Sequence, residues 1–349
     1  MFMQLPASQR MFWPDLVRCC ALCLVVLVHV SGSILNNGYY AAPPAHWWFA
    51  AAVGALGRCG APLFFMLSGA LLLGKVSSEP AGSFLKKRIG KVIFPFLGWS
   101  IIYTARKIIR HTMPLSLSSF LSILSTPAYY HLWFFYSIIG LYLIAPLFAG
   151  AKPPIFRYVF WLWFISVCCT FCVSGIPHFG LNGNFTGVLP TYLGYFVAGY
   201  LLRDVVLAGK KRTYAWIVLT ASFCITLAGT GLLTLRNNGV LDGFFYNYLN
   251  VSIVAMTLAA FLLLKIWGER VPARPFANAI RTVSACSLGI YAFHPLLLEW
   301  LSSGYLGIKL NASFMHPLLG IPLTFAVTLL VSAGFVVVLS KIPLVKKIV

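Results

Sequence analysis

Residues 16–35 read LVRCCALCLVVLVHVSGSIL, and this stretch decides the fold. A helix needs about 20 mainly apolar residues to cross the hydrocarbon core of a bilayer, and this run supplies them. It is too long for the apolar part of a cleavable signal peptide and has no clear small-residue cleavage site. The stretch therefore predicts a permanent transmembrane helix, with Arg18 and His29 as its basic side chains.

The rest of the chain repeats this pattern. Of the 349 residues, 60% are hydrophobic and 9% are charged, whereas a soluble domain averages about 25% charged residues. The sequence therefore predicts an all-α, polytopic integral membrane protein with about ten transmembrane helices, forming a single domain over residues 1–349 without a soluble domain. The expected spans are 15–35, 48–74, 89–106, 130–150, 155–175, 188–207, 213–235, 247–267, 283–303 and 315–340.

The positive charge indicates the orientation of the chain. If the N-terminus is cytoplasmic, most of the 26 Lys and Arg residues fall in cytoplasmic segments, for example at residues 86–88 and 210–212. By the positive-inside rule, both termini are expected in the cytoplasm. A net charge of +20 also occurs in nucleic-acid-binding proteins. Here the charges form short clusters between apolar runs, so we expect membrane lipids and no nucleic acid as partners.

The pattern Cys-Cys-x-x-Cys occurs twice, beginning at Cys19 and at Cys168. Such spacing could indicate a metal site. Both copies lie within apolar runs, where cysteine commonly serves as a small buried residue. We therefore expect no bound metal.

Ionisable side chains within membrane spans are costly and are functional hypotheses by default. Arg18 and His29 are eleven residues apart, which places them within about 20° on the same helix face and about 16 Å apart along the axis. Arg18 is thus expected near the cytoplasmic opening, where it could bind a phosphate, and His29 deeper, where it could act as a base. The alternatives are that Arg18 snorkels to the interface beside Asp15, and that His29 makes an interhelical hydrogen bond.

Arg58 lies in the second span at a depth close to that of His29. It could bind an anion or stabilise a developing oxyanion. The alternative is a buried ion pair with Glu299.

His294, Glu299 and His131 complete the set of candidate residues. His294 and Glu299 are about 140° apart on an ideal helix, so they share a face only if Pro295 kinks it. Glu299 could orient a histidine from another helix. His131 could border an acceptor site, or it could belong to an aromatic belt at the membrane interface.

Four motifs together resemble the membrane acyltransferase-3 family from about residue 12 to the C-terminus. They are Arg18-x10-His29, the stretch RCGAPLFFMLSG from Arg58, the stretch HLWFFY from His131, and the stretch SLGIYAFHP that contains Tyr291 and His294. The chain departs from the family pattern at Cys19-Cys20, where Gly or Ala is commoner, and at Ala70, where Tyr or Phe often follows Ser-Gly.

The resemblance implies an O-acyltransferase in the inner membrane of a bacterium. It implies acetyl-CoA as the acyl donor and a hydroxyl of a cell-envelope glycan or polyprenyl-linked saccharide as the acceptor. It also implies that Arg18 and His29 are essential. We expect His29 and Arg58 to be catalytic, Arg18 to bind coenzyme A, and His131, Tyr291, His294 and Glu299 to support the site.

A protein of a different class would also place ionisable groups inside the membrane. A carrier or flippase for lipid-linked sugars could use His29 and Glu299 to relay protons. Transporters often contain internal repeats, and none is evident in this sequence.

Overall fold

The computed structural model describes residues 11–174, 191–270, 276–305, 307–343 and 345–349, and every regular element in these ranges is a helix. The expected all-α class is therefore confirmed for this part of the chain. The elements are α1 (Trp13–Leu35), η1 (Tyr39–Ala41), α2 (Pro44–Gly57), α3 (Gly60–Leu72), η2 (Leu73–Ser78), α4 (Ala81–Ile109), α5 (Leu117–Leu121), η3 (Ser122–Leu124), α6 (Trp133–Ile144), η4 (Ala145–Phe148), α7 (Pro153–Ser174), α8 (Leu193–Leu202), α9 (Lys210–Arg236), α10 (Val251–Arg270), α11 (Ala277–Ala285), α12 (Ser287–Ser303), α13 (Pro317–Leu339) and η6 (Val345–Lys347).

Seven helical segments of the described chain are long and apolar enough to cross a membrane. The three other expected spans coincide with the shorter helices α6, α8 and α12, although residues 188–190 lie outside the described ranges. The helices thus indicate a multi-pass membrane protein. The number ten and the cytoplasmic location of both termini stay predictions. The seven segments are Trp13–Leu35, Pro44–Ser78, Ala81–Ile109, Pro153–Cys172, Lys210–Arg236, Val251–Arg270 and Pro317–Leu339.

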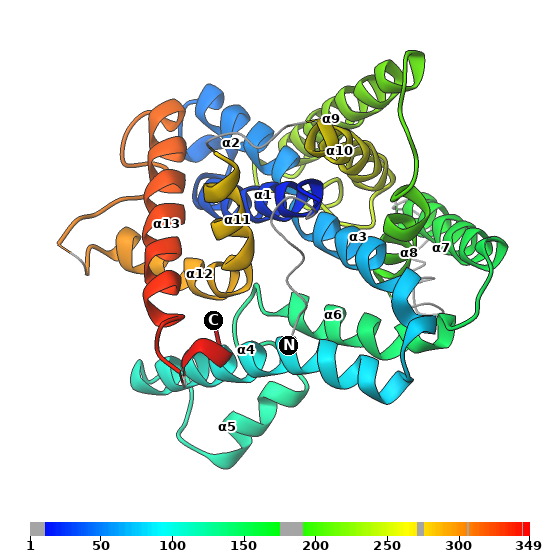
Figure 1. Cartoon of the computed structure of the whole chain (residues 1–349). Coiled ribbons are helices and arrows are strands. Elements are labelled where there is room, and N and C mark those ends of the chain that lie inside the picture. The colour runs from blue at the N-terminus through cyan, green and yellow to red at the C-terminus, as the bar shows by residue number, and fades with distance from the viewer. Residues whose placement is uncertain (1–10, 175–190, 271–275, 306, 344) are drawn as a thin grey trace.

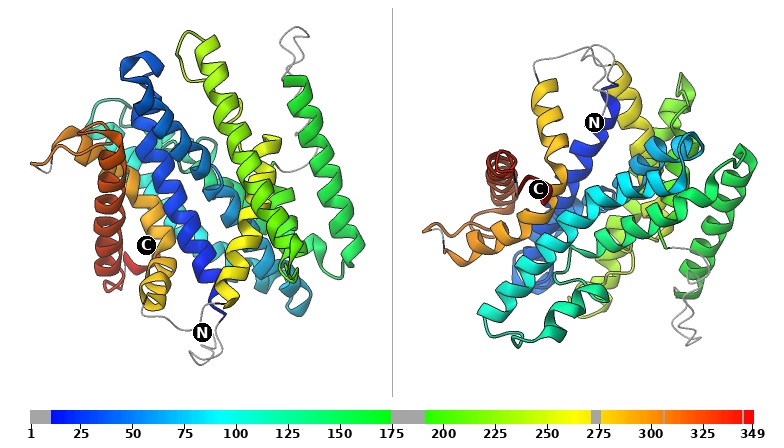
Figure 2. Two further views of the ribbon diagram at one scale, coloured as in Figure 1. Left: turned by 90° about the horizontal axis from the view of Figure 1, so that it is seen from above. Right: turned by 60° about the horizontal axis from the view of Figure 1, so that its bottom comes forward.

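Helix α1 lies at the centre of the bundle (Figure 1) and contacts α2, α3, α10, α11, α12 and α13. Seen from above, α1 crosses the middle of the molecule, with α13 on one side of it and α9 and α7 on the other (Figure 2). Because so many helices converge on α1, its side chains face protein as well as lipid. That position allows polar groups in the middle of the helix to be sheltered from hydrocarbon.

Two glycines let the second segment approach α1 closely. A Cβ atom at Gly60 would lie 2.8 Å from the carbonyl oxygen of Ala21 and 2.9 Å from the backbone nitrogen of Val25. A Cβ atom at Gly57 would likewise collide with α1, at Val28. Small residues that permit such backbone contacts are a principal means of helix association in membranes. Between these two glycines lies Arg58, which is thereby brought beside α1.

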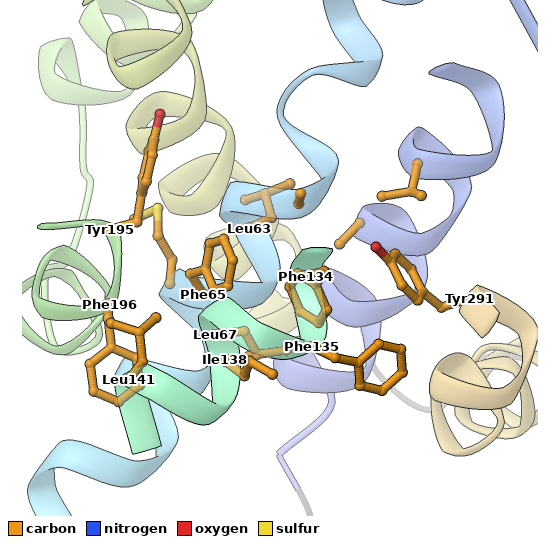
Figure 3. Close-up of a cluster of buried hydrophobic side chains, with 14 of the residues drawn as sticks. Leu63, Phe65, Leu67, Phe134, Phe135, Ile138, Leu141, Tyr195, Phe196 and Tyr291 are labelled. Carbon is orange, nitrogen blue, oxygen red and sulfur yellow. The ribbon is translucent and has the colours of Figure 1, made fainter. Parts of the chain in front are cut away.

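Aromatic packing holds α6 against its neighbours (Figure 3). The Phe134 ring of α6 stacks on Phe65 of α3 at 4.9 Å between centroids, and it lies 5.2 Å from Tyr291 of α12. Rings in these arrangements add about 0.5–1.5 kcal/mol per pair beyond the burial of their surface. This cluster fixes the start of α6, two residues after His131.

The close approach at Gly60 leads to a stability prediction. Gly60→Ala should lower the free energy of unfolding by about 1–3 kcal/mol, because the added methyl group overpacks a contact between two backbones. Thermal unfolding in detergent measures the effect. Gly90→Ala is the matched control, because a Cβ atom there meets nothing within 4 Å and Ala is favoured over Gly in a helix by about 1 kcal/mol. Equal melting temperatures for the two variants would contradict the packing argument.

Candidate active site

A pocket of about 510 Å³ opens beside the C-terminal half of α1. Ser33 and Asn36 lie at the same end of α1, so the pocket is on the side that the sequence predicts to be extracytoplasmic. Its charged or imidazole-bearing lining residues are His29, Arg58 and Glu299. The structure therefore brings three of the candidate residues from three different helical segments into the lining of one pocket.

Arg58 occupies the short break between α2 and α3, where it ends the first helix. Its guanidinium carbon lies 4.8 Å from the centroid of the Tyr246 ring and 5.5 Å from that of Tyr248. Cation–π contacts of this kind hold a guanidinium in place without neutralising its charge. The Nε atom of Arg58 is buried and has no hydrogen-bond partner in the described chain.

The His294 ring is oriented by the proline that follows it. Pro295 has no N–H, so the carbonyl of Tyr291 loses its usual helical donor. The Nδ1 atom of His294 lies 2.8 Å from that carbonyl oxygen. Since a carbonyl only accepts, Nδ1 carries the hydrogen, and in the neutral ring Nε2 holds the lone pair. His294 Nε2 is buried and has no partner in the described residues.

His131 is fixed by the same helix. Its Nε2 atom lies 3.2 Å from the carbonyl oxygen of Ala292, so Nε2 carries the hydrogen of the ring. The Tyr291 hydroxyl donates to the carbonyl oxygen of His131 at 2.5 Å. His131 is 1% exposed, so the alternative of an interfacial aromatic belt does not describe its surroundings. Its Nδ1 atom has no partner in the described chain.

The three imidazoles form a row that ends at the pocket. The His29 and His294 rings are 5.2 Å apart between centroids, and the His294 and His131 rings are 5.8 Å apart. His29 lines the pocket, whereas His294 is fully buried and contacts His29 from the protein side. The wall of the pocket thus has an accessible imidazole supported by two buried ones.

Glu299 has other partners than those considered from the sequence. Its carboxylate accepts hydrogen bonds from Arg106, from Arg110 at 2.6 Å and from the Tyr129 hydroxyl at 3.1 Å. The suggested orientation of a histidine and the alternative ion pair with Arg58 are therefore not what the structure shows. The reason is that α4 crosses α12 at this level and presents two arginines to the carboxylate.

Arg18 lies at the opposite end of α1 and does not line the pocket. Its Nη1 atom donates to the Ser284 hydroxyl at 3.1 Å and lies 3.8 Å from the Asp15 carboxylate. Ser284 in turn donates to Asp15 at 2.7 Å. Asp15, which the alternative interpretation placed beside Arg18, is thus its neighbour, and Ser284 of α11 joins it in positioning the guanidinium, which is 30% exposed.

Sequence reasoning missed several residues of the site. Tyr129 and Tyr130 line the pocket, and the Tyr130 ring is 5.0 Å from that of His29. Arg106 and Arg110 also belong to the site, because both pair with the lining residue Glu299. The available signal was their spacing, because residues four apart share one face of a helix and two arginines on one face indicate a shared anionic partner.

The pocket holds both the imidazole of His29, which can accept a hydrogen bond, and the fixed positive charge of Arg58. A neutral histidine can remove a proton from a hydroxyl, and a guanidinium can stabilise negative charge that develops nearby. Among the described residues no group of three His, Cys, Asp or Glu side chains could hold a metal ion. The site is suited to nucleophilic attack by a hydroxyl on a polarised carbonyl.

The model of a family described as an acyltransferase domain matches residues 11–337. No curated protein and no solved structure matches the chain. The family match covers nearly the whole chain, including α1, the pocket and α12.

Proposed function

This chain belongs to the membrane acyltransferase-3 family, and from that premise we propose that it moves an acetyl group from acetyl-CoA to a hydroxyl of a cell-envelope glycan or lipid-linked sugar. The observation that carries the proposal is the pocket wall, in which His29 and Arg58 lie together. The proposed location is the bacterial inner membrane. The quoted motifs also resemble those of the O-acetyltransferase of enterobacterial common antigen, which motivates the proposed acceptor.

The proposed reaction begins with the acceptor hydroxyl in the pocket. Its oxygen attacks the thioester carbonyl carbon while a nitrogen of His29 takes the hydroxyl proton. Negative charge that develops on the carbonyl oxygen is stabilised by Arg58. The carbon–sulfur bond then breaks, the proton passes from His29 to the departing thiolate, and the products are the acetyl ester and free coenzyme A.

The donor is proposed to enter from the end of α1 that carries Arg18. Coenzyme A carries phosphates, for which a guanidinium is a suitable partner. Arg18 and His29 are about 16 Å apart along the helix axis. The extended pantetheine arm of coenzyme A bridges such a distance, so the phosphates can lie at Arg18 while the thioester reaches His29.

His294 acts in this proposal as a positioning residue, because it contacts His29 and does not line the pocket. We expect His294→Phe to lower kcat by about tenfold to a hundredfold, a fraction of the usual contribution of general acid–base catalysis. KM for the acceptor should change little. Steady-state kinetics measures both constants.

His46 provides the matched control for that variant, because its ring also contacts a histidine, His316 at 4.5 Å, and it does not line the pocket. His46→Phe should retain the wild-type kcat. A rise in KM without a fall in kcat in His294→Phe would place His294 in acceptor binding instead.

The proposed function is tested by mass spectrometry of envelope glycans. Cells with the protein should carry glycans heavier by one acetyl group than cells without it. Cells that produce His29→Ala should match those without the protein. Identical glycan masses in all three would contradict the proposed function.

A further inference from the structure

We infer that the acceptor is an anionic saccharide, which carries a phosphate or a carboxylate beside its sugar ring. The inference rests on the proposed function, since that identifies the pocket as the acceptor site. It is carried by the balance of charge around the pocket and by the aromatic side chains that line it.

Positive charge exceeds negative charge at the pocket. Glu299 is the carboxylate among the lining residues, and Arg106 and Arg110, which do not themselves line the pocket, both pair with it. Arg58 adds a third guanidinium in the wall. Asp242 follows the lining residue Leu241 but does not itself line the pocket. Its carboxylate accepts a hydrogen bond from the backbone N–H of Phe244 at 2.8 Å. Arg106 and Arg110 therefore share the carboxylate of Glu299, and Arg58 pairs with no carboxylate among the described residues.

Two of these guanidinium groups remain available to bind an additional anion. The buried Nε of Arg58 has no hydrogen-bond partner in the described chain. The side chain of Arg110 is 37% exposed, and its guanidinium also lies 5.4 Å from the Tyr305 ring. A charge kept in a partly dry site without a full counter-charge is costly. A bound anion offsets that cost, whereas a neutral ligand leaves it in place.

The lining also indicates that the anion belongs to a sugar. Tyr129 and Tyr130 pack with their ring centroids 4.7 Å apart, and both line the pocket with Trp133, Tyr246 and Tyr248. Flat aromatic surfaces fit the apolar C–H face of a sugar ring, while the phenol hydroxyls meet its polar edge. A site that binds only free phosphate does not require such aromatic surfaces.

The inference is tested by equilibrium binding to the purified protein in nanodiscs, measured calorimetrically without coenzyme A. One probe pair is p-nitrophenyl β-D-glucuronide and p-nitrophenyl β-D-glucoside, which differ in one carboxylate. The second pair is glucose 1-phosphate and glucose. We expect at least one anionic probe to bind about tenfold or more tightly than its neutral partner. We expect added salt to weaken this preference, because Arg110 is partly exposed.

Substitutions that each remove one positive charge identify the residue that causes the preference for the anionic probe. Arg110→Gln should reduce the preference for the anionic probe several-fold. Lys107→Gln is the matched control, because it removes the same charge from the same helix end, and Lys107, unlike Arg110, does not pair with the lining residue Glu299. Equal binding within both wild-type pairs, no binding of either anionic probe, or an equal effect of the two substitutions would overturn the inference.

The pattern of probes also separates the two sources of charge. Preference for glucose 1-phosphate alone indicates a phosphate-linked acceptor, and preference for the glucuronide indicates an acidic sugar. The outcome is independent of catalysis. A protein that binds anionic probes but never consumes acetyl-CoA would contradict the proposed function alone, and one that acetylates only neutral sugars would contradict this inference alone.

Discussion

We expect His29→Ala to bind coenzyme A as tightly as the wild-type protein and to lose acetyl transfer by about a hundredfold to ten-thousandfold, the usual contribution of a general base. Binding should persist because Arg18 lies about 16 Å away along the axis of α1 and keeps its contacts with Ser284 and Asp15. Titration with coenzyme A and an assay of acetyl transfer measure the two properties separately.

The control for this prediction is His46→Ala, which removes an imidazole of α2 that does not line the pocket. It should transfer acetyl groups at the wild-type rate. Wild-type turnover in His29→Ala would show that another group removes the proton. Loss of coenzyme A binding in His29→Ala, with His46→Ala unaffected, would show that His29 is needed for the donor site and not for chemistry alone.

The second large effect is expected at Arg58. Arg58→Met should lower kcat by about a hundredfold to a thousandfold, as is found when a group that stabilises an oxyanion is removed. Arg58→Lys should restore only part of the loss, because an ammonium is a point charge without the planar donor fork of a guanidinium. Steady-state kinetics with acetyl-CoA in excess measures kcat directly.

Arg236→Met is the matched control for Arg58, because Arg236 ends α9 in an exposed position and does not line the pocket. It should leave kcat unchanged. If Arg58→Met raises KM for the acceptor and leaves kcat intact, Arg58 binds the acceptor equally in the ground state and the transition state. That result would remove the oxyanion role.

The fold was predictable from the sequence to the extent that hydropathy determines it. Long apolar runs require helices in a membrane, and the helix at residues 13–35 coincides with the first expected span. Hydropathy did not reveal the break at Arg58, since the backbone there leaves the helix for only two residues between apolar segments. The short helices α6, α8 and α12 show why the number of spans is harder to predict than their positions.

The candidate site was predictable where one helix carries two polar residues, because helical periodicity relates Arg18 to His29. It was not predictable where contacts join distant segments. The arginine partners of Glu299 lie near the C-terminal end of α4, far away in the sequence. The orientation of His294 depends on a carbonyl that Pro295 leaves without its helical donor. Contacts of this kind cannot be predicted from the spacing of residues in the sequence.

The most direct test of an acetyltransferase in this pocket is the release of free coenzyme A by the purified protein in nanodiscs. With acetyl-CoA and an envelope-glycan fraction, we predict release that depends on the glycan, stops in His29→Ala and is matched by acetyl groups gained on the glycan. Movement of lipid-linked sugar across the bilayer with no glycan-dependent release of coenzyme A would contradict the account and favour a carrier.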